Sequence, residues 1–390
     1  MVKPNYELAQ VIHHHQSNYY KQHTPHAHIA KVLQAILQCR TQALGGHVDG
    51  CNTCGHLRIS YNSCGNRHCP KCQTTQKERW IEKRESDLLN TNYFHVVFTL
   101  PQELNTYCLH YPTAMYNLLF KASSDTIKTF AADEKHLGAQ VGMISVLHTW
   151  GQNLSLHPHV HMIVPSGGVS RAGFWKPSKY KCDFLFPVKA LSKVYRAKFM
   201  EGFRQLLSSQ KQELNKTLRE TLYQKSWVVY AKQPFAGPKQ VIEYLGRYSH
   251  KIAISNHRLL NVNSQTVKFS YKDYRSGGQH KVMELNGVEF LRRFSLHILP
   301  TGFRKIRHYG ILASRNKPKL RTQQMQMGII PKRQQALITW QQMLLQKHGI
   351  DIEKCPCCKT GKMIRLLSFE ANAPPLALLK QARQQALNIA

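Results

Sequence analysis

The clearest pattern of polar and apolar positions in this chain is an alternation from His157 to Val164. Alternation with a period of two is typical of a β-strand, because successive side chains point to opposite faces. One predicted face carries His159, His161 and Ile163, and the other carries Val160, Met162 and Val164, which we expect to enter a core. Two imidazoles on one strand face have the arrangement that chelates a divalent metal ion, although such a pair also occurs as ordinary surface histidines.

The same analysis predicts strands and helices in alternation along most of the chain. Further strands are expected at residues 94–100, 141–150 and 227–231, with three short ones near 258–260, 266–271 and 281–285. Helices are expected at residues 6–39, 102–135, 188–224, 241–251 and 334–348. This order favours an α+β fold in which helices pack on an antiparallel sheet. The basic stretch 315–333 is predicted to be a linker or a DNA-contacting arm.

These elements divide into three predicted units. Residues 1–90 form a helical and cysteine-rich unit, residues 91–310 form the main α+β unit, and residues 311–390 combine the basic arm, a helix and a short C-x-x-C segment. A chain of 390 residues is long enough for such units to have cores of their own.

The net charge of the chain predicts a class of binding partner. Lys plus Arg is 54 and Asp plus Glu is 21, which gives a formal net charge of +33. A folded protein with this excess is expected to bind a polyanion, and nucleic acid is the first candidate. No apolar run of eighteen residues and no signal peptide is found, so a membrane role is not expected. We expect a cytoplasmic, nucleoid-associated location instead. No glycine-rich nucleotide loop occurs, which indicates chemistry without ATP.

Nine of the eleven cysteines fall into two short clusters, a distribution that favours zinc over disulfides. Two C-x-x-C pairs, Cys51 with Cys54 and Cys69 with Cys72, are predicted to complete one zinc tetrahedron. A possible second zinc site draws on Cys39, His47, Cys64 and His68, which are otherwise buried thiols and hydrogen-bonded imidazoles. Cys355 and Cys358 supply half of a further site, whose other ligands are either distant in this chain or supplied by a second subunit, unless the two thiols stay free.

A predicted helix near residue 244 carries the remaining candidate chemistry. Tyr244 and Tyr248 lie four residues apart and Lys251 seven after the first, so all three share one helical face. Such a tyrosine pair usually serves packing alone. On a basic chain with a histidine pair, however, two phenols and a lysine are the groups needed to cut a DNA strand through a phosphotyrosine bond.

Several long motifs resemble one family, the rolling-circle transposases of the insertion-sequence-91 group, which belong to the HUH endonuclease superfamily. The resemblance covers most of the chain and rests on the stretches Gly45–His56, Tyr61–Cys72, His95–Pro101, His148–Leu154, His157–His161, Tyr244–Tyr248 and Lys251–Asn256. It implies a zinc-binding domain followed by an HUH domain, in which a central antiparallel sheet flanked by helices carries the histidine pair beside the tyrosine helix.

The resemblance also implies a mechanism. His159 and His161 would hold Mg²⁺ or Mn²⁺, although histidine ligands also suit Zn²⁺. HUH sites use a third protein ligand, for which Gln152 is the first choice, His148 the second and His157 the third. One tyrosine would attack the DNA and form a 5′-phosphotyrosine, helped by Lys251, and the second tyrosine would permit a second cut.

The expected substrate is single-stranded DNA at the ends and target of a mobile element, contacted by basic residues with interleaved aromatic side chains. The candidate DNA-contacting residues are Arg58, Arg67, Lys71, Arg247, Arg304 and Lys305. Two alternatives remain open: a plasmid or phage replication initiator or relaxase that uses the same chemistry, and a zinc-dependent DNA-binding protein without catalysis.

Overall fold

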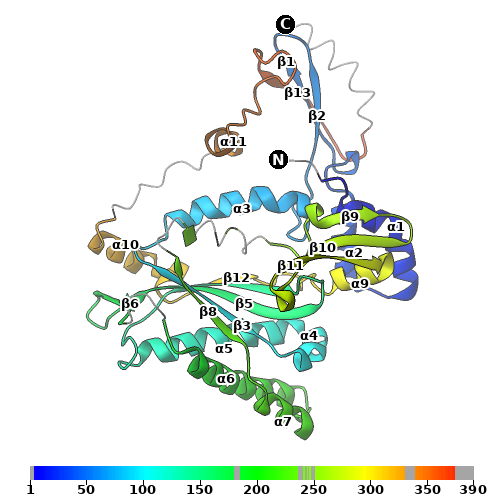
Figure 1. Ribbon diagram of the computed structural model, residues 1–390. Coiled ribbons are helices and arrows are strands. Elements are labelled where there is room, and N and C mark those ends of the chain that lie inside the picture. Colours follow the sequence, from blue (N-terminus) through cyan, green and yellow to red (C-terminus); the bar gives the residue numbers. More distant parts are fainter. Residues whose placement is uncertain are drawn as a thin grey trace.

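The computed structural model describes residues 4–179, 185–235, 240, 241, 244, 246, 251–329 and 339–373. Its centre is an antiparallel sheet of five strands (Figure 1). Their order across the sheet is β12 (Ile306–Tyr309), β4 (Met143–Trp150), β5 (Leu156–Pro165), β3 (Tyr93–Thr99) and β8 (Val229–Phe235). The histidine-rich strand β5 therefore lies in the middle of the sheet, between β4 and β3.

The two faces of this sheet have different neighbours. Val160, Met162 and Val164 of β5 are fully buried in the largest hydrophobic core. That core is completed by helices α4 (Asn105–His110), α5 (Pro112–Ala132), α6 (Val188–Ser209) and α7 (Lys216–Gln224), which Figure 1 shows along one side of the sheet. On the opposite face, Ile163 packs in a smaller cluster with Ile81 of α3 (Pro70–Glu85). The alternation along β5 thus separates a structural face from a face that carries histidines.

A second lobe lies beside the central sheet and combines segments far apart in sequence. It contains helices α1 (Leu8–Gln22), α2 (Ala27–Leu37) and α9 (Gly287–Ser295), packed on a sheet of β11 (Gln279–Asn286), β10 (Thr266–Asp273) and β9 (Leu259–Val262). The α1–α9 contact is so close that a Cβ atom on Gly287 would lie 2.2 Å from the His15 ring. A glycine is therefore required at that position.

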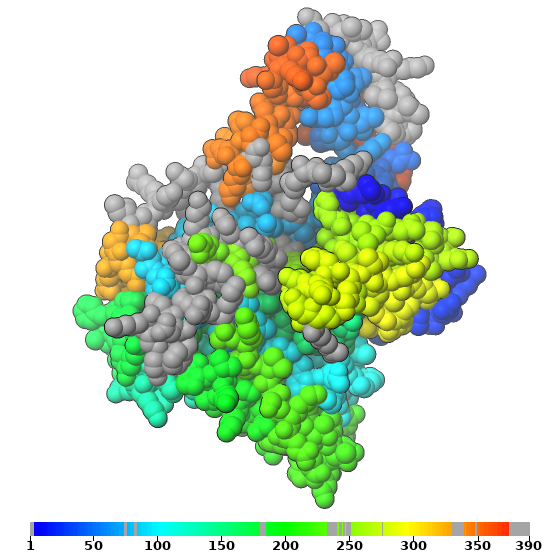
Figure 2. Space-filling view, viewed as in Figure 1, coloured from blue at the N-terminus to red at the C-terminus, as the bar shows by residue number. Residues whose placement is uncertain are grey.

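An early and a late segment of the chain meet in a projecting unit, here called the terminal ribbon, made of β13 (Met363–Phe369), β1 (Gly46–Cys51) and β2 (Leu57–Tyr61). Figure 2 shows the blue residues of the N-terminal region and the orange residues of the C-terminal region side by side in this projection. Helix α11 (Trp340–His348) precedes the ribbon; it starts at a capping box between Thr339 and Gln342 and ends at Gly349 in the left-handed conformation.

Apart from short 3-10 helices, the other elements of the described residues are β6 (Gly167–Val169), β7 (Trp175–Pro177) and α10 (Lys317–Gln326). Among the described residues, no helix combines the length and the apolar character needed to span a bilayer. Helix α10 corrects one of two alternatives for the basic stretch 315–333, because this part is a packed helix and not a linker; contact of this stretch with DNA stays a prediction. The helix buries Leu320 among the residues behind the central sheet, and its Gln324 donates hydrogen bonds to two backbone carbonyls after α3.

The predicted α+β class with antiparallel sheets is confirmed. The predicted strand at 157–164 and helices at 102–135 and 188–224 are present, the helices each divided into shorter ones. The stretch 6–39 is likewise two helices, α1 and α2, and Pro25 lies between them. The boundaries predicted at residues 90 and 310 stay predictions, but packing crosses both, since α1 contacts α9 and β1 pairs with β13.

Candidate functional site

Three histidines on neighbouring strands form a compact group on the less apolar face of the central sheet. His159 and His161 lie on β5, and the register of β4 against β5 places His148 directly opposite His159. One ring nitrogen from each of the three lies within 4.8 Å of the other two. The predicted histidine pair thus shares a face, and His148 supplies a third donor of the kind that binds divalent transition metals.

Two of these rings are oriented by hydrogen bonds that leave one nitrogen for a metal ion. The Nδ1–H of His159 donates to the carbonyl oxygen of His157 at 2.7 Å. Nδ1 of His161 lies 2.9 Å from Nε2 of His95 on β3. Metal-bound histidines commonly use one nitrogen for the ion and the other for such a bond. Both rings therefore present Nε2 toward the shared position, and the residues fit a divalent metal.

Burial keeps these imidazoles neutral. It lowers the pKa of His159 to about 4, with further lowering from the charges of His157 and Lys251. The pKa of His161 is also well below its usual range, mainly because of burial and secondly because of His159. A neutral ring has the lone pair that a metal ion needs, so the site is in its ligating form at neutral pH.

Tyr244 is the predicted nucleophile that the structure places at this site. Gln240, Val241, Tyr244 and Gly246 are helical, as expected, and the Tyr244 hydroxyl lies 2.8 Å from Nδ1 of His95. Since Nε2 of the same ring contacts His161, one imidazole connects the phenol to a candidate metal ligand. Tyr248 lies outside the described residues.

Two lysines bring positive charge to the same region. The Lys305 ammonium donates to the backbone oxygen of Lys251 at 2.6 Å and lies 5.2 Å from the centre of the Trp150 ring. Burial and the neighbouring Arg67 lower the pKa of Lys305 to about 7. Lys251 as a whole residue is exposed, but its ammonium group is partly buried. This burial and the charge of Arg258 lower the pKa of Lys251. Each of these two charges also helps to lower the pKa of His161.

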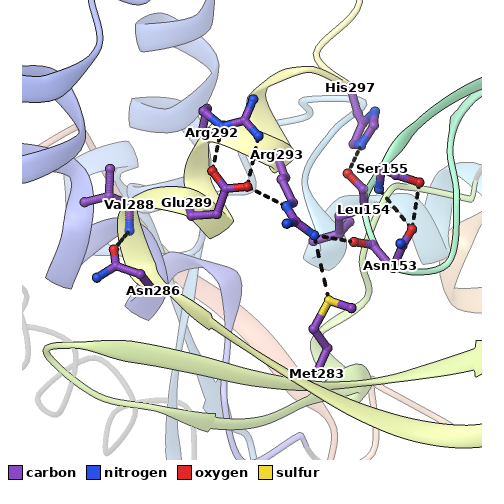
Figure 3. A network of polar contacts seen from close by, with 10 residues as sticks. All are labelled: Asn153, Leu154, Ser155, Met283, Asn286, Val288, Glu289, Arg292, Arg293 and His297. Carbon is purple, nitrogen blue, oxygen red and sulfur yellow. Dashed lines mark hydrogen bonds and ion pairs between the residues drawn. The ribbon is translucent and has the colours of Figure 1, made fainter. Parts of the chain in front are cut away.

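Gln152, the first choice for the third ligand, lies four residues after His148, in the turn that follows β4. This turn is held by α9 and the residues just after it: Arg293 of α9 donates to the backbone oxygen of Asn153, and His297 donates to that of Leu154 (Figure 3). Arg258 donates to the backbone oxygen of Gln152. The geometry therefore favours the second choice, His148, because cross-strand register sets it opposite His159. His157 contributes its backbone oxygen to the site rather than a ring among the three grouped imidazoles.

The cysteines also assemble differently from the predicted pairing. Cys51, Cys54, Cys69 and Cys72 do not form one site; the structure divides them between two groups of four thiols. The first group is Cys39, Cys64, Cys69 and Cys72, and the second is Cys51, Cys54, Cys355 and Cys358. Two complete tetrathiolate sets form instead of one set plus a mixed cysteine–histidine set, and both have the donors of structural zinc.

In the first group, four thiols lie close together and the two histidines predicted as ligands lie elsewhere. The Sγ atom of Cys72 lies 3.6 Å from the Sγ atoms of both Cys39 and Cys64. The two histidines predicted as ligands have other partners: His47 lies 3.6 Å from a carboxylate oxygen of Asp49, and His68 accepts a hydrogen bond from the backbone of Leu299. Burial lowers the pKa of His68 to about 3.

Most of the predicted DNA-contacting residues have partners within the protein. Arg58 pairs with Asp49 at 3.1 Å and Lys71 with Glu7 at 2.6 Å. Arg67 donates to the backbone oxygens of Phe303 and Pro300 at 2.5 and 2.8 Å. Of the others, Arg304 is exposed, Lys305 lies by the histidines, and Arg247 lies outside the described residues. Arg67 therefore joins the cysteine-rich region to the segment after α9, and DNA contact by these residues stays a prediction.

His95 is the residue that sequence reasoning missed as part of the site. It is 3% exposed, and its ring stacks on that of His161 with centroids 5.1 Å apart. A signal was present in the sequence, since a polar histidine interrupts the apolar strand at residues 94–100. Its meaning depends on the pairing of β3 with β5, which places His95 on the face that carries His159 and His161.

Comparison with known proteins identifies the family of the chain. Residues 142–319 match a family described as "Putative transposase", and residues 11–100 match one described as "Transposase zinc-binding domain" of the insertion-sequence-91 type. "Putative transposase y4qJ" of Sinorhizobium fredii (strain NBRC 101917 / NGR234) is 41% identical over 393 residues, covering 96% of this chain and 98% of that protein. "Transposase for insertion sequence element IS801" of Pseudomonas savastanoi pv. phaseolicola is 31% identical over 308 residues, covering 73% of this chain and 70% of that protein. No solved structure matches the chain.

Proposed function

The chain belongs to the insertion-sequence-91 family of transposases, and we propose that it nicks and rejoins single-stranded DNA through 5′-phosphotyrosine intermediates in rolling-circle transposition. The observation that carries this proposal is the line of contacts from Tyr244 through His95 to His161. It joins a nucleophile to a group of metal donors within a few ångströms. The reaction is proposed to depend on a divalent metal and not on ATP, because a phosphotyrosine bond conserves the energy of the cleaved phosphoester.

His148, His159 and His161 are proposed to hold the catalytic ion, with Mg²⁺ or Mn²⁺ as the working candidates. When bound, a divalent ion would polarise the scissile phosphate as a Lewis acid. The three-imidazole set would also accept Zn²⁺.

The proton positions in this line follow from the orientation of the rings. If His161 presents Nε2 to the ion, its neutral ring carries the proton on Nδ1 and donates it to Nε2 of His95. His95 then carries its own proton on Nδ1, the ring nitrogen nearer the Tyr244 oxygen (2.8 Å, against 3.4 Å for Nε2), and is proposed to donate to that oxygen once the phenol moves into the plane of the ring. A donor aimed at the phenolic oxygen favours the phenolate, which is the attacking form. His95 is thus proposed as the positioning residue of the nucleophile.

In the proposed cleavage, the Tyr244 oxygen bonds to phosphorus while the bond from phosphorus to the 3′ oxygen breaks. The phenolic proton is released to solvent and the departing 3′ oxygen takes up a proton. Rejoining reverses these bond changes with a 3′ hydroxyl as the attacking group. Tyr248 is proposed as the second nucleophile, and Lys251 with Lys305 as the groups that stabilise charge on the phosphate.

Single-stranded DNA is the proposed substrate because the nucleophile must reach a bare backbone. The β10–β11 connection supports this, since Tyr274 is 69% exposed and the Lys272 ammonium lies 5.5 Å from its ring centre. An exposed aromatic ring beside a cation suits base stacking and backbone contact. The overall charge of +33 predicts that binding weakens steeply with salt.

The test uses the full-length protein and labelled single strands carrying each end of the mobile element. We expect a covalent adduct on a denaturing gel that requires Mg²⁺ or Mn²⁺. The adduct should disappear in the Tyr244→Phe, Tyr248→Phe double variant and in His159→Ala. Retained DNA binding with no adduct from the wild-type protein at either end would contradict the proposal and favour a DNA-binding protein without catalysis.

A further inference from the structure

The second group of four thiols joins an early and a late segment of the chain. Cys51 ends β1 and Cys54 lies in the turn between β1 and β2, whereas Cys355 and Cys358 precede β13. The nearest pairs across the group are separated by 301 and 307 residues in sequence. The pairing of β1 with β13 brings them together, with Cys51 opposite Met363 at the end of the ladder.

The sulfur distances match a zinc tetrahedron. Sγ of Cys51 lies 3.7 Å from Sγ of Cys358, and Sγ of Cys54 lies 3.7 Å from Sγ of Cys355. A tetrahedral ion with zinc–sulfur bonds of about 2.3 Å sets its sulfurs about 3.8 Å apart. A disulfide would require about 2.0 Å. The thiols therefore stand at the spacing of ligands around one ion and not at that of a bond to each other.

Backbone donors converge on these sulfurs from both turns. The amides of Thr53 and Cys54 point at Sγ of Cys51 at 3.4 and 3.5 Å. In the other turn, the Cys357 amide points at Sγ of Cys355 at 3.4 Å and the Gly361 amide at Sγ of Cys358 at 3.3 Å. Amide hydrogens directed at sulfur stabilise thiolates, which are the form that binds metal.

The two turns are also fitted to each other apart from the sulfurs. Asn52 and Lys362 exchange two hydrogen bonds: the Lys362 amide donates to Oδ1 of Asn52 at 2.8 Å, and the Asn52 amide donates to the Lys362 oxygen at 3.1 Å. A Cβ atom on Gly361 would lie 2.5 Å from Sγ of Cys51 and 2.6 Å from the Thr53 hydroxyl. This close approach requires glycine at 361 and shows that the C-terminal turn is built to close over the N-terminal one.

We infer that Cys51, Cys54, Cys355 and Cys358 of one chain bind a single structural zinc ion, so that the C-terminal segment is part of the zinc-binding domain. Four thiolates are the donor set that favours Zn²⁺ over hard cations such as Mg²⁺. The site is independent of the cleavage chemistry at the histidines. It also resolves the choice between distant ligands and a second subunit for Cys355 and Cys358, in favour of ligands in the same chain.

The test measures zinc per chain in full-length variants by mass spectrometry of the metal. Cys51→Ser and Cys355→Ser should each lose one zinc relative to wild type, and the double variant should also lose one, because both residues hold the same ion. The matched control is Cys357→Ser, since Cys357 is exposed and outside the group. Cys358→His should keep the zinc, and in the cobalt-substituted protein it should shift the absorption from a four-sulfur to a three-sulfur, one-nitrogen spectrum.

Several results would overturn the inference. Loss of two zinc ions in the double variant would show that the two pairs bind separate ions. Full zinc content in Cys355→Ser would remove the C-terminal pair from any site. Mixing Cys51→Ser with Cys355→Ser chains tests the same-chain assignment: zinc content should stay at the level of each variant alone, and recovery in the mixture would mean that two chains share the ion.

Discussion

Replacing His95 with phenylalanine should slow strand cleavage without unfolding the protein. Phenylalanine keeps a planar ring at a position that is 3% exposed, but it removes both ring nitrogens. The hydrogen bonds lost are those to Tyr244 at 2.8 Å and to His161 at 2.9 Å. Loss of a partner that orients a metal-bound histidine typically costs 10- to 100-fold in metal affinity or activity. We therefore expect a cleavage rate about 10 to 100 times lower, or about 1.4 to 2.7 kcal/mol.

The assay is single-turnover formation of the covalent DNA adduct at a series of Mn²⁺ concentrations, with thermal unfolding measured in parallel. His95→Phe should raise the Mn²⁺ concentration needed for half-maximal rate as well as lower the rate itself, because His161 loses its orienting partner. His95→Gln should fall between wild type and His95→Phe, since its amide can replace one of the two bonds. A suitable control is Ser145→Ala, on the opposite face of the sheet, whose hydroxyl is buried without a hydrogen-bond partner.

A wild-type rate and a wild-type metal requirement in His95→Phe would refute the positioning role. Equal loss of rate in Ser145→Ala would show that the sheet tolerates no substitution, and the argument about His95 would fail with it.

Three further predictions concern the ligand set, pH and the backbone. His148→Ala should abolish Mn²⁺-dependent cleavage, whereas Gln152→Ala should retain it within a few-fold; the reverse order in the adduct assay would restore Gln152 as the ligand. Burial lowers the pKa of His297 to about 4, so the unfolded chain, with a pKa near 6.5, binds more protons between these values. The free energy of unfolding should therefore fall by up to about 3 kcal/mol as pH drops from 6.5 to 4, and His297→Gln should flatten this slope in denaturant titrations; an unchanged slope would contradict the cause. A Cβ atom on Gly310 would lie 1.8 Å from a backbone oxygen, whereas one on Gly302 meets no atom within 4 Å, and both residues have positive φ. Gly302→Ala should cost about 1 to 2 kcal/mol and Gly310→Ala clearly more; similar melting temperatures for the two variants would show that the backbone relaxes at no cost.

The sequence supported much of the fold because the relevant signals are local. Alternation from His157 to Val164 identified β5 and its two faces, and the apolar face is fully buried as expected. Helical periodicity identified α5 and α6 for the same reason. Periodicity did not identify α10, because this helix is rich in lysine, arginine and glutamine and buries too few apolar residues to give a helical pattern.

The sequence predicted the types of side chain in the site, but not which residues come together there. Histidine, tyrosine and cysteine donors were identified from residue type and short spacing. The third imidazole and the bridging His95 were not fixed by spacing, because they reach β5 from β4 and β3 and their alignment depends on strand register.

By itself, the sequence determined the donor chemistry of this transposase, the elements that carry it and its preference for a polyanion, since each follows from side-chain type, short-range periodicity or summed charge. Only the tertiary structure decided which donors act together. Cys51 meets Cys358, rather than the nearer pair at Cys69 and Cys72, because β1 pairs with β13. Contacts across some three hundred residues are selected by the packing of the whole chain, and no local pattern in the sequence encodes them.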